Sequence, residues 1–175
     1  MKAAFLFLLL TSPALAQNSP SQPAVASGCG AANARFDVKN VKGQDAPTQP
    51  EAGKALVYFI QDDSEYTGLF APTTRAGVDG AWVGATHGNS YFAFSVAPGE
   101  HHLCASLQTS EGANPSSARA LVHFTAEAGN VYYFRVKTKW HRDYANTVID
   151  FTPVDSDEGM LLASTFSLKT SRPRN

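Results

Sequence analysis

The chain has 175 residues, with 14 basic and 15 acidic side chains and a formal net charge of −1 at pH 7. This balance argues against nucleic acid and anionic membrane surfaces as partners, because both are recognised through concentrated positive charge. Two cysteines are too few for a disulfide-rich scaffold, and they do not form a C-x-x-C zinc pair.

The first sixteen residues predict a secretory signal peptide. Lys2 precedes an apolar run at residues 3–10, and residues 14–16 (ALA) have the small side chains of a cleavage site. No apolar run reaches the roughly 18 residues that a membrane-spanning helix needs. We therefore expect an exported protein, periplasmic or secreted, that is cleaved after Ala16. The 159 residues that follow are enough for one domain.

Residues 17–28 (QNSPSQPAVASG) have too few apolar side chains to pack and predict a flexible leader. Cys29 follows small residues, as a lipid-anchored cysteine does. A lipidation site should directly follow the apolar run, however, and eighteen residues separate Leu10 from Cys29. The spacing therefore argues against lipid anchoring at Cys29.

A series of short β signals then follows. Their ranges are 34–39, 54–61, 73–78, 81–87, 91–96, 101–108, 119–126, 131–139 and 147–154. Asp79-Gly80 separates two of them and is a strong hairpin signal, because both turn residues need a positive φ. The run at 54–61 is nearly continuously apolar, as in a strand buried on both faces. We expect this strand and the one at 131–139 to be central and buried.

Residues 155–163 alone indicate a helix, with Asp155 or Ser156 as its cap. Residues 170–175 are basic and predict a disordered tail. The pattern predicts an all-β fold over a single domain at residues 29–169. We expect an antiparallel two-layer β-sandwich, immunoglobulin- or transthyretin-like, with seven to nine strands and one short C-terminal helix at an end or edge.

The two cysteines are expected to pair. Alternation along residues 101–108 places Leu103, Ala105 and Leu107 on the core face, so Cys104 points to the opposite face. A Cys29–Cys104 disulfide would hold the N-terminal segment across that outer face. It would close a loop of about 75 residues, for which chain entropy predicts about 4 kcal/mol of stabilisation.

Candidate chemistry is sparse. His101 and His102 point to opposite faces of their strand and cannot chelate one metal without a further ligand from another strand. The acidic groups at residues 62–65 and 155–158 do not match a calcium loop, and no catalytic motif occurs. We expect no catalytic residues, no metal and no cofactor. The alternative is a metal-dependent or hydrolytic enzyme that uses His101 or His102 with acids near Asp62 and Asp155.

A binding surface is the leading functional hypothesis. On residues 131–139 the odd positions form an amphipathic face that includes Tyr133 and Arg135, and Trp82 follows the Asp79-Gly80 turn. Tyr133 is a candidate anchor for a partner, whereas aliphatic stems of Arg and Lys over a sheet are also ordinary packing. Export, the sandwich architecture, the modest charge and the absence of a catalytic motif favour a non-enzymatic binding or structural module of the cell envelope, with a protein, peptide or glycan as its partner.

Four segments resemble the bacterial exported family called domain of unknown function 2846. They are PEAGKALVYFIQDD at 50–63, SVAPGEHHLCASLQ at 95–108, TAEAGNVYYFRV at 125–136 and DSDEGMLL at 155–162. The resemblance implies a small β-rich envelope domain, often a lipoprotein, with no established biochemical activity. It transfers no catalytic residues, and this chain differs from the lipoprotein members in having no cysteine at its predicted cleavage site.

Overall fold

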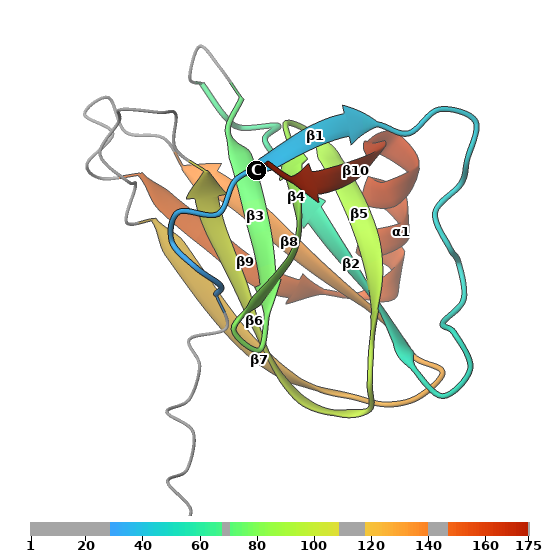
Figure 1. Cartoon of the computed structure of the whole chain (residues 1–175). Coiled ribbons are helices and arrows are strands. Elements are labelled where there is room, and N and C mark those ends of the chain that lie inside the picture. Colours follow the sequence, from blue (N-terminus) through green and yellow to red (C-terminus); the bar gives the residue numbers. More distant parts are fainter. Residues whose placement is uncertain (1–28, 68–70, 109–117, 140–146, 175) are drawn as a thin grey trace, which may run out of the picture.

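The computed structural model describes residues 29–67, 71–108, 118–139 and 147–174. The predicted signal peptide (1–16) and leader (17–28) lie outside these residues. In the described ranges ten strands form two facing sheets, and one helix lies on the outside of the larger sheet (Figure 1). The prediction of a β-sandwich with a short C-terminal helix is therefore confirmed.

The larger sheet has six strands. In spatial order they are β1 (Phe36–Asn40), β10 (Ser167–Pro173), β5 (Ser90–Val96), β2 (Ala55–Gln61), β8 (Val131–Lys139) and β9 (Val148–Val154). Every residue of β2 is buried, because β2 lies between β5 and β8 and both of its faces are covered. This confirms that the apolar run at residues 54–61 forms a central strand.

The smaller sheet has four antiparallel strands. In spatial order they are β4 (Ala81–His87), β3 (Thr73–Val78), β6 (Gly99–Gln108) and β7 (Arg119–Ala126). The β3–β4 hairpin turns at Asp79 and Gly80, whose φ angles are 50° and 86°. These positive values confirm the hairpin predicted from the Asp-Gly pair.

The main core fills the space between the two sheets. Phe59 of β2 packs 5.7 Å from the ring of Phe92 and 5.4 Å from that of Phe151. Leu103 and Ala105 of β6 face this core from the smaller sheet. The alternation predicted for residues 101–108 is thus confirmed, and it leaves Cys104 on the outer face of that sheet.

Helix α1 (Ser156–Thr165) covers the outer face of the six-stranded sheet, beside β2 and β8 (Figure 1). Asp155 caps it by accepting a hydrogen bond from the backbone N of Glu158 at 2.9 Å. Leu162 and Phe166 pack on a second apolar cluster on this face. The expected position at an end or edge is wrong, because β2 has an apolar outer face that a helix must cover. No helix in the described ranges is long and apolar enough to cross a membrane.

Three further details of the prediction need correction. The described residues contain ten strands rather than seven to nine. Residues 170–173, expected in a disordered tail, belong to β10, which pairs along its length with β1 and briefly with β5. The larger sheet is mixed, because the β2–β8 and β10–β5 pairs are parallel. Both pairs join distant segments, so short-range turn signals could not reveal them.

Residues 29–35, here called the N-terminal strap, run over the outer face of the four-stranded sheet. The predicted Cys29–Cys104 disulfide is present, with a Cα–Cα distance of 5.1 Å. Arg75 of β3 donates to the carbonyl oxygens of Ala32 and Ala34 at 3.0 and 2.6 Å. The strap is therefore held by one covalent bond and by hydrogen bonds to its backbone.

Candidate functional site

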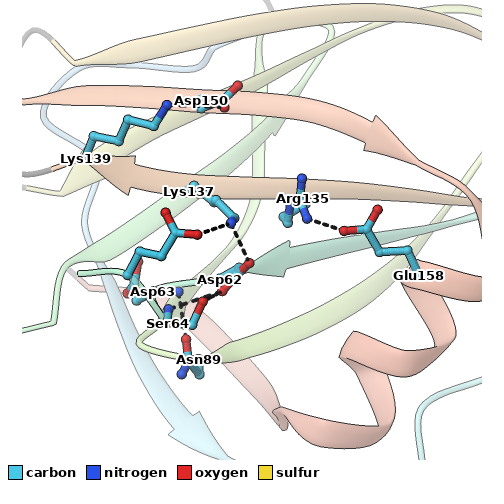
Figure 2. Close-up of polar contacts among 10 residues, drawn as sticks. Asp62, Asp63, Ser64, Asn89, Arg135, Lys137, Lys139, Asp150 and Glu158 are labelled. Carbon is cyan, nitrogen blue, oxygen red and sulfur yellow. Dashed lines mark hydrogen bonds and ion pairs between the residues drawn. The ribbon is translucent and has the colours of Figure 1, made fainter.

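Polar side chains gather where β2 ends and the acidic loop of residues 62–65 begins (Figure 2). Asp62 Oδ1 accepts hydrogen bonds from Ser64 N and Oγ at 3.1 and 2.6 Å. Lys137 Nζ of β8 lies 3.5 Å from Asp62 Oδ2 and 3.0 Å from Glu65 Oε1. Asp62 is only 6% exposed, and Ser64 and Lys137 satisfy its buried carboxylate.

The adjacent carboxyl groups of Asp62 and Asp63 differ in pKa. Burial raises the pKa of Asp62, but hydrogen bonds from Ser64 and the charge of Lys137 outweigh burial and leave it below the usual value. Burial raises the pKa of Asp63 to about 6, against a hydrogen bond from Gln61, and the charge of Asp62 adds to the rise. Asp62 is thus a carboxylate at neutral pH, whereas Asp63 changes charge near pH 6.

Gln61 connects this loop to both sheets. Its side chain is fully buried at the end of β2. Its Nε2 donates to Asp63 Oδ2 at 2.6 Å and to the carbonyl of Pro72 at 2.9 Å, while its Oε1 accepts from Thr86 of β4 at 2.7 Å. Because buried polar groups need partners, this network fixes the loop relative to the smaller sheet.

The basic side chains on the outer face of β8 all have acidic partners. Arg135 pairs with Glu158 of α1, and Lys137 pairs with the acidic loop (Figure 2). Lys139 lies 3.8 Å from Asp150 of β9. The charges on this face therefore neutralise one another and tie β8 to its neighbours, rather than forming a positive patch that would attract an anion.

Tyr133 lies under helix α1 and does not form an exposed anchor. A Cβ added to Gly159 would overlap the Tyr133 ring and lie 2.6 Å from its Cβ, so the helix backbone rests directly on this side chain. The Tyr133 ring is also 4.8 Å from that of Tyr58. Arg135 is partly covered by its contact with Glu158. The outer face of β8 is thus mainly a packing surface for the helix.

Trp82 lies on the other sheet, beneath the N-terminal strap. Its Nε1 donates to the carbonyl of Ala31 at 2.8 Å, and the Arg75 guanidinium lies 4.4 Å from the centre of its ring. A Cβ on Gly30 would lie 2.8 Å from Trp82 Nε1. Trp82, Tyr133 and Arg135 therefore do not form one binding surface, because they belong to different sheets and the first two are covered by different segments.

His101 belongs to β6 and lies near one end of β2, whereas the acidic loop follows the other end. Its Nδ1 contacts Asp79 Oδ2 at 2.6 Å, and its Nε2 contacts the carbonyl of Ala97 at 2.7 Å. Burial lowers the pKa of His101, but these two contacts raise it more, so its pKa lies above the usual value. The 7 residues of β2 span about 20 Å, which separates His101 from Asp62.

The residues of the enzyme alternative are therefore not assembled in the described structure. His102 is exposed on the face of β6 opposite His101, as alternation predicted. Asp155 is committed to capping α1. Among the described residues, no group of three or more His, Cys, Asp or Glu side chains could hold a metal ion.

Two features of the structure were not predicted from the sequence. Gln61 ends an otherwise apolar run, and a lone amide at the end of a fully buried strand is a signal that could have predicted the polar network. His123 of β7 lies directly opposite His102 in the sheet. That pairing depends on the register between two strands, which the sequence pattern did not define.

Fold and site together define a disulfide-linked β-sandwich with a helix on one outer face. The family described as "Protein of unknown function (DUF2846)" matches residues 51–148, more than half of the chain. The chain belongs to this family, which confirms the resemblance noted in its sequence. No curated protein and no solved structure matches the chain.

Proposed function

We propose that this chain is an exported cell-envelope protein that works as a non-enzymatic binding or structural module. The Cys29–Cys104 disulfide carries the export part of the proposal, because structural disulfides persist in oxidising compartments and are rare in the cytosol. The signal-peptide pattern of residues 1–16 supports the same compartment. The two features are independent, since one is a sequence pattern and the other a contact between distant residues.

The polar side chains described above have partners within the protein, which supports a binding or structural role rather than catalysis. Both ring nitrogens of His101 have partners, and each basic residue on the outer face of β8 has an acidic one. A catalytic group needs access to a substrate proton or a reacting atom. These side chains instead join strands, loop and helix to one another.

We place the binding surface on the outer face of β6 and β7. The N-terminal strap covers the β3–β4 part of this sheet but leaves Leu121 of β7 61% exposed. His102 and His123 are exposed on the same face. Strand β7 is also an edge of its sheet, which is where a protein or peptide can add a strand.

Export is tested by expressing the whole chain in a bacterial host and alkylating the thiols before isolation. The mass of the intact protein is then measured. We expect a chain that begins at Gln17 with both cysteines protected from alkylation. An uncleaved cytosolic chain with two alkylated cysteines would contradict the proposal.

Binding is tested by capture from envelope extract with the purified chain, followed by measurement of affinity for the captured component. Leu121→Lys should abolish saturable binding. Leu161→Lys is the matched control, because Leu161 is similarly exposed on α1, far from this face. Equal loss in both variants, or retention in both, would reject this surface. Hydrolytic activity lost in His101→Ala or His102→Ala would favour the enzyme alternative.

A further inference from the structure

Two histidines lie close together on the proposed binding face of β6 and β7. His102 of β6 and His123 of β7 are cross-strand partners, and their ring centres are 6.4 Å apart. Both side chains are exposed. Within the described residues neither ring has a hydrogen-bond partner, in contrast to His101 with its two contacts and His87 with Thr73. Their nitrogens are therefore available to a ligand.

The backbone places these two side chains at the closest kind of antiparallel position. The backbone N of His102 donates to Asp79 Oδ1 at 2.8 Å, and its carbonyl accepts from Asp79 N at 2.9 Å. Both polar groups thus point toward β3 and away from β7. His102 and His123 therefore form a non-hydrogen-bonded pair, in which facing side chains approach more closely than in the hydrogen-bonded type.

The ring separation is close to the one that a shared metal ion requires. A metal–nitrogen bond of about 2.0–2.1 Å places the ion roughly 3 Å from the centre of each imidazole ring, so two ligating rings lie up to about 6 Å apart. The observed 6.4 Å lies just above this limit, so rotation of the side chains is needed to bring both rings onto one ion. Because both residues are exposed, no neighbouring core packing opposes that rotation.

We infer that His102 and His123 form a two-histidine site for a divalent transition-metal ion of the Cu²⁺, Ni²⁺ and Zn²⁺ class. Imidazole nitrogen suits these ions, and Cu²⁺ is held most tightly among them. The described residues supply no third His, Cys, Asp or Glu ligand, so water or a donor from another molecule completes the coordination. This inference does not depend on export or on a protein partner.

The test is calorimetric titration of the tag-free full chain with CuCl₂ and with ZnCl₂. We expect one equivalent of metal in the wild type and at least about tenfold weaker binding in His102→Ala and in His123→Ala, because loss of even a residue that orients a metal ligand typically costs about 10–100-fold in affinity. His87→Ala is the matched control, since His87 is an exposed strand histidine elsewhere on the same sheet. It should bind like the wild type.

Histidine-detected NMR of the wild type keeps the test independent of how the variants fold. Zinc should shift the ring signals of His102 and His123 together and leave His101 unchanged. Wild-type affinity in both ligand variants, or equal loss in His87→Ala, would overturn the site. Zinc-induced shifts confined to other histidines would overturn it as well. Loss of metal binding with intact partner capture would leave the proposed binding module standing, so the two proposals fail separately.

Discussion

The two outer faces of the sandwich are covered in different ways. On the six-stranded sheet, helix α1 buries an apolar surface that includes Leu56, Ile60 and Tyr133. On the four-stranded sheet, the N-terminal strap offers mostly glycine and alanine, so it cannot gain much from apolar burial. It is held by the Cys29–Cys104 bond and by donors from Arg75 and Trp82. The cover with little apolar surface is thus held by a covalent link, whereas the apolar cover is held by packing.

Loss of the disulfide should give the largest effect and act on the strap side alone. Replacing both Cys29 and Cys104 by Ala removes a link across 75 residues. Chain entropy predicts a loss of about 4 kcal/mol in the free energy of unfolding. Urea denaturation measures this value. A reductant should lower the stability of the wild type and leave the double variant unchanged, and a reductant-insensitive wild type would contradict the prediction.

On the helix side, Gly159→Ala should destabilise the protein although alanine is the better helix former. The new Cβ would overlap the Tyr133 ring, and overpacking of this kind costs about 1–3 kcal/mol against the roughly 1 kcal/mol gained in helix propensity. Thermal and urea unfolding measure the net loss. Met160→Ala is the control, since Met160 is 53% exposed and should change little. A stabilised Gly159→Ala variant would mean that the helix does not rest on Tyr133.

In the helix-covered sheet, acidity should act just beyond the C-terminal end of the central strand β2, through Asp63. Because the folded-state pKa of about 6 exceeds the usual value of 3.8, the folded protein binds this proton more tightly than the unfolded chain. The contribution of Asp63 to stability is therefore complete below about pH 4 and is lost as the pH rises through 6. Asp63→Asn should remove this slope and stabilise the protein above pH 6 by on the order of 1 kcal/mol, after allowance for partial exposure.

The neighbouring carboxyl group provides a control of opposite sign. The pKa of Asp62 is lowered in the folded state, so its contribution is present above the unfolded pKa and is lost as the pH falls. Asp62→Asn should therefore destabilise the protein at pH 7. Urea denaturation between pH 4 and pH 8 measures both variants. The same sign of change in the two variants at pH 7 would contradict the assignment.

The smallest expected effect concerns the ion pair between β8 and α1. Arg135 and Glu158 are both partly exposed, and pairs of this kind contribute about 0.5 kcal/mol. A double-mutant cycle with Arg135→Ala and Glu158→Ala measures the coupling energy. The more exposed pair of Lys139 and Asp150 should give a smaller value. A coupling several times larger would show that charge, rather than apolar burial, holds the helix on its sheet.

Local patterns predicted most of the strands. The Asp79-Gly80 turn and the alternation at residues 101–108 were sufficient to predict the β3–β4 hairpin and the outward position of Cys104. They could not predict β10, because its sequence SLKTSRP carries basic residues and a proline and is stabilised by pairing with the distant β1. The sequence pattern thus predicted individual strands and a hairpin turn, but not the pairing of strands that are distant in the chain.

The candidate site was less predictable for the same reason. Tyr133 was expected on an open face because its amphipathic strand gave no sign of the helix above it. The helix itself is weakly amphipathic, and the buried residue within it is Gly159, which has no apolar side chain. The burial of Asp62 likewise depends on Lys137, which is far away in the chain. Residue type and alternation specified which face a side chain takes, but not what covers that face.

Hydrogen exchange measured by mass spectrometry, with and without reductant, tests the contrast between the two faces most directly. Reduction should speed exchange in residues 29–35, where the strap depends on Cys29, and leave residues 156–165 of helix α1 unchanged. Equal acceleration of both segments would contradict the account, as would a strap that stays protected after the disulfide is reduced.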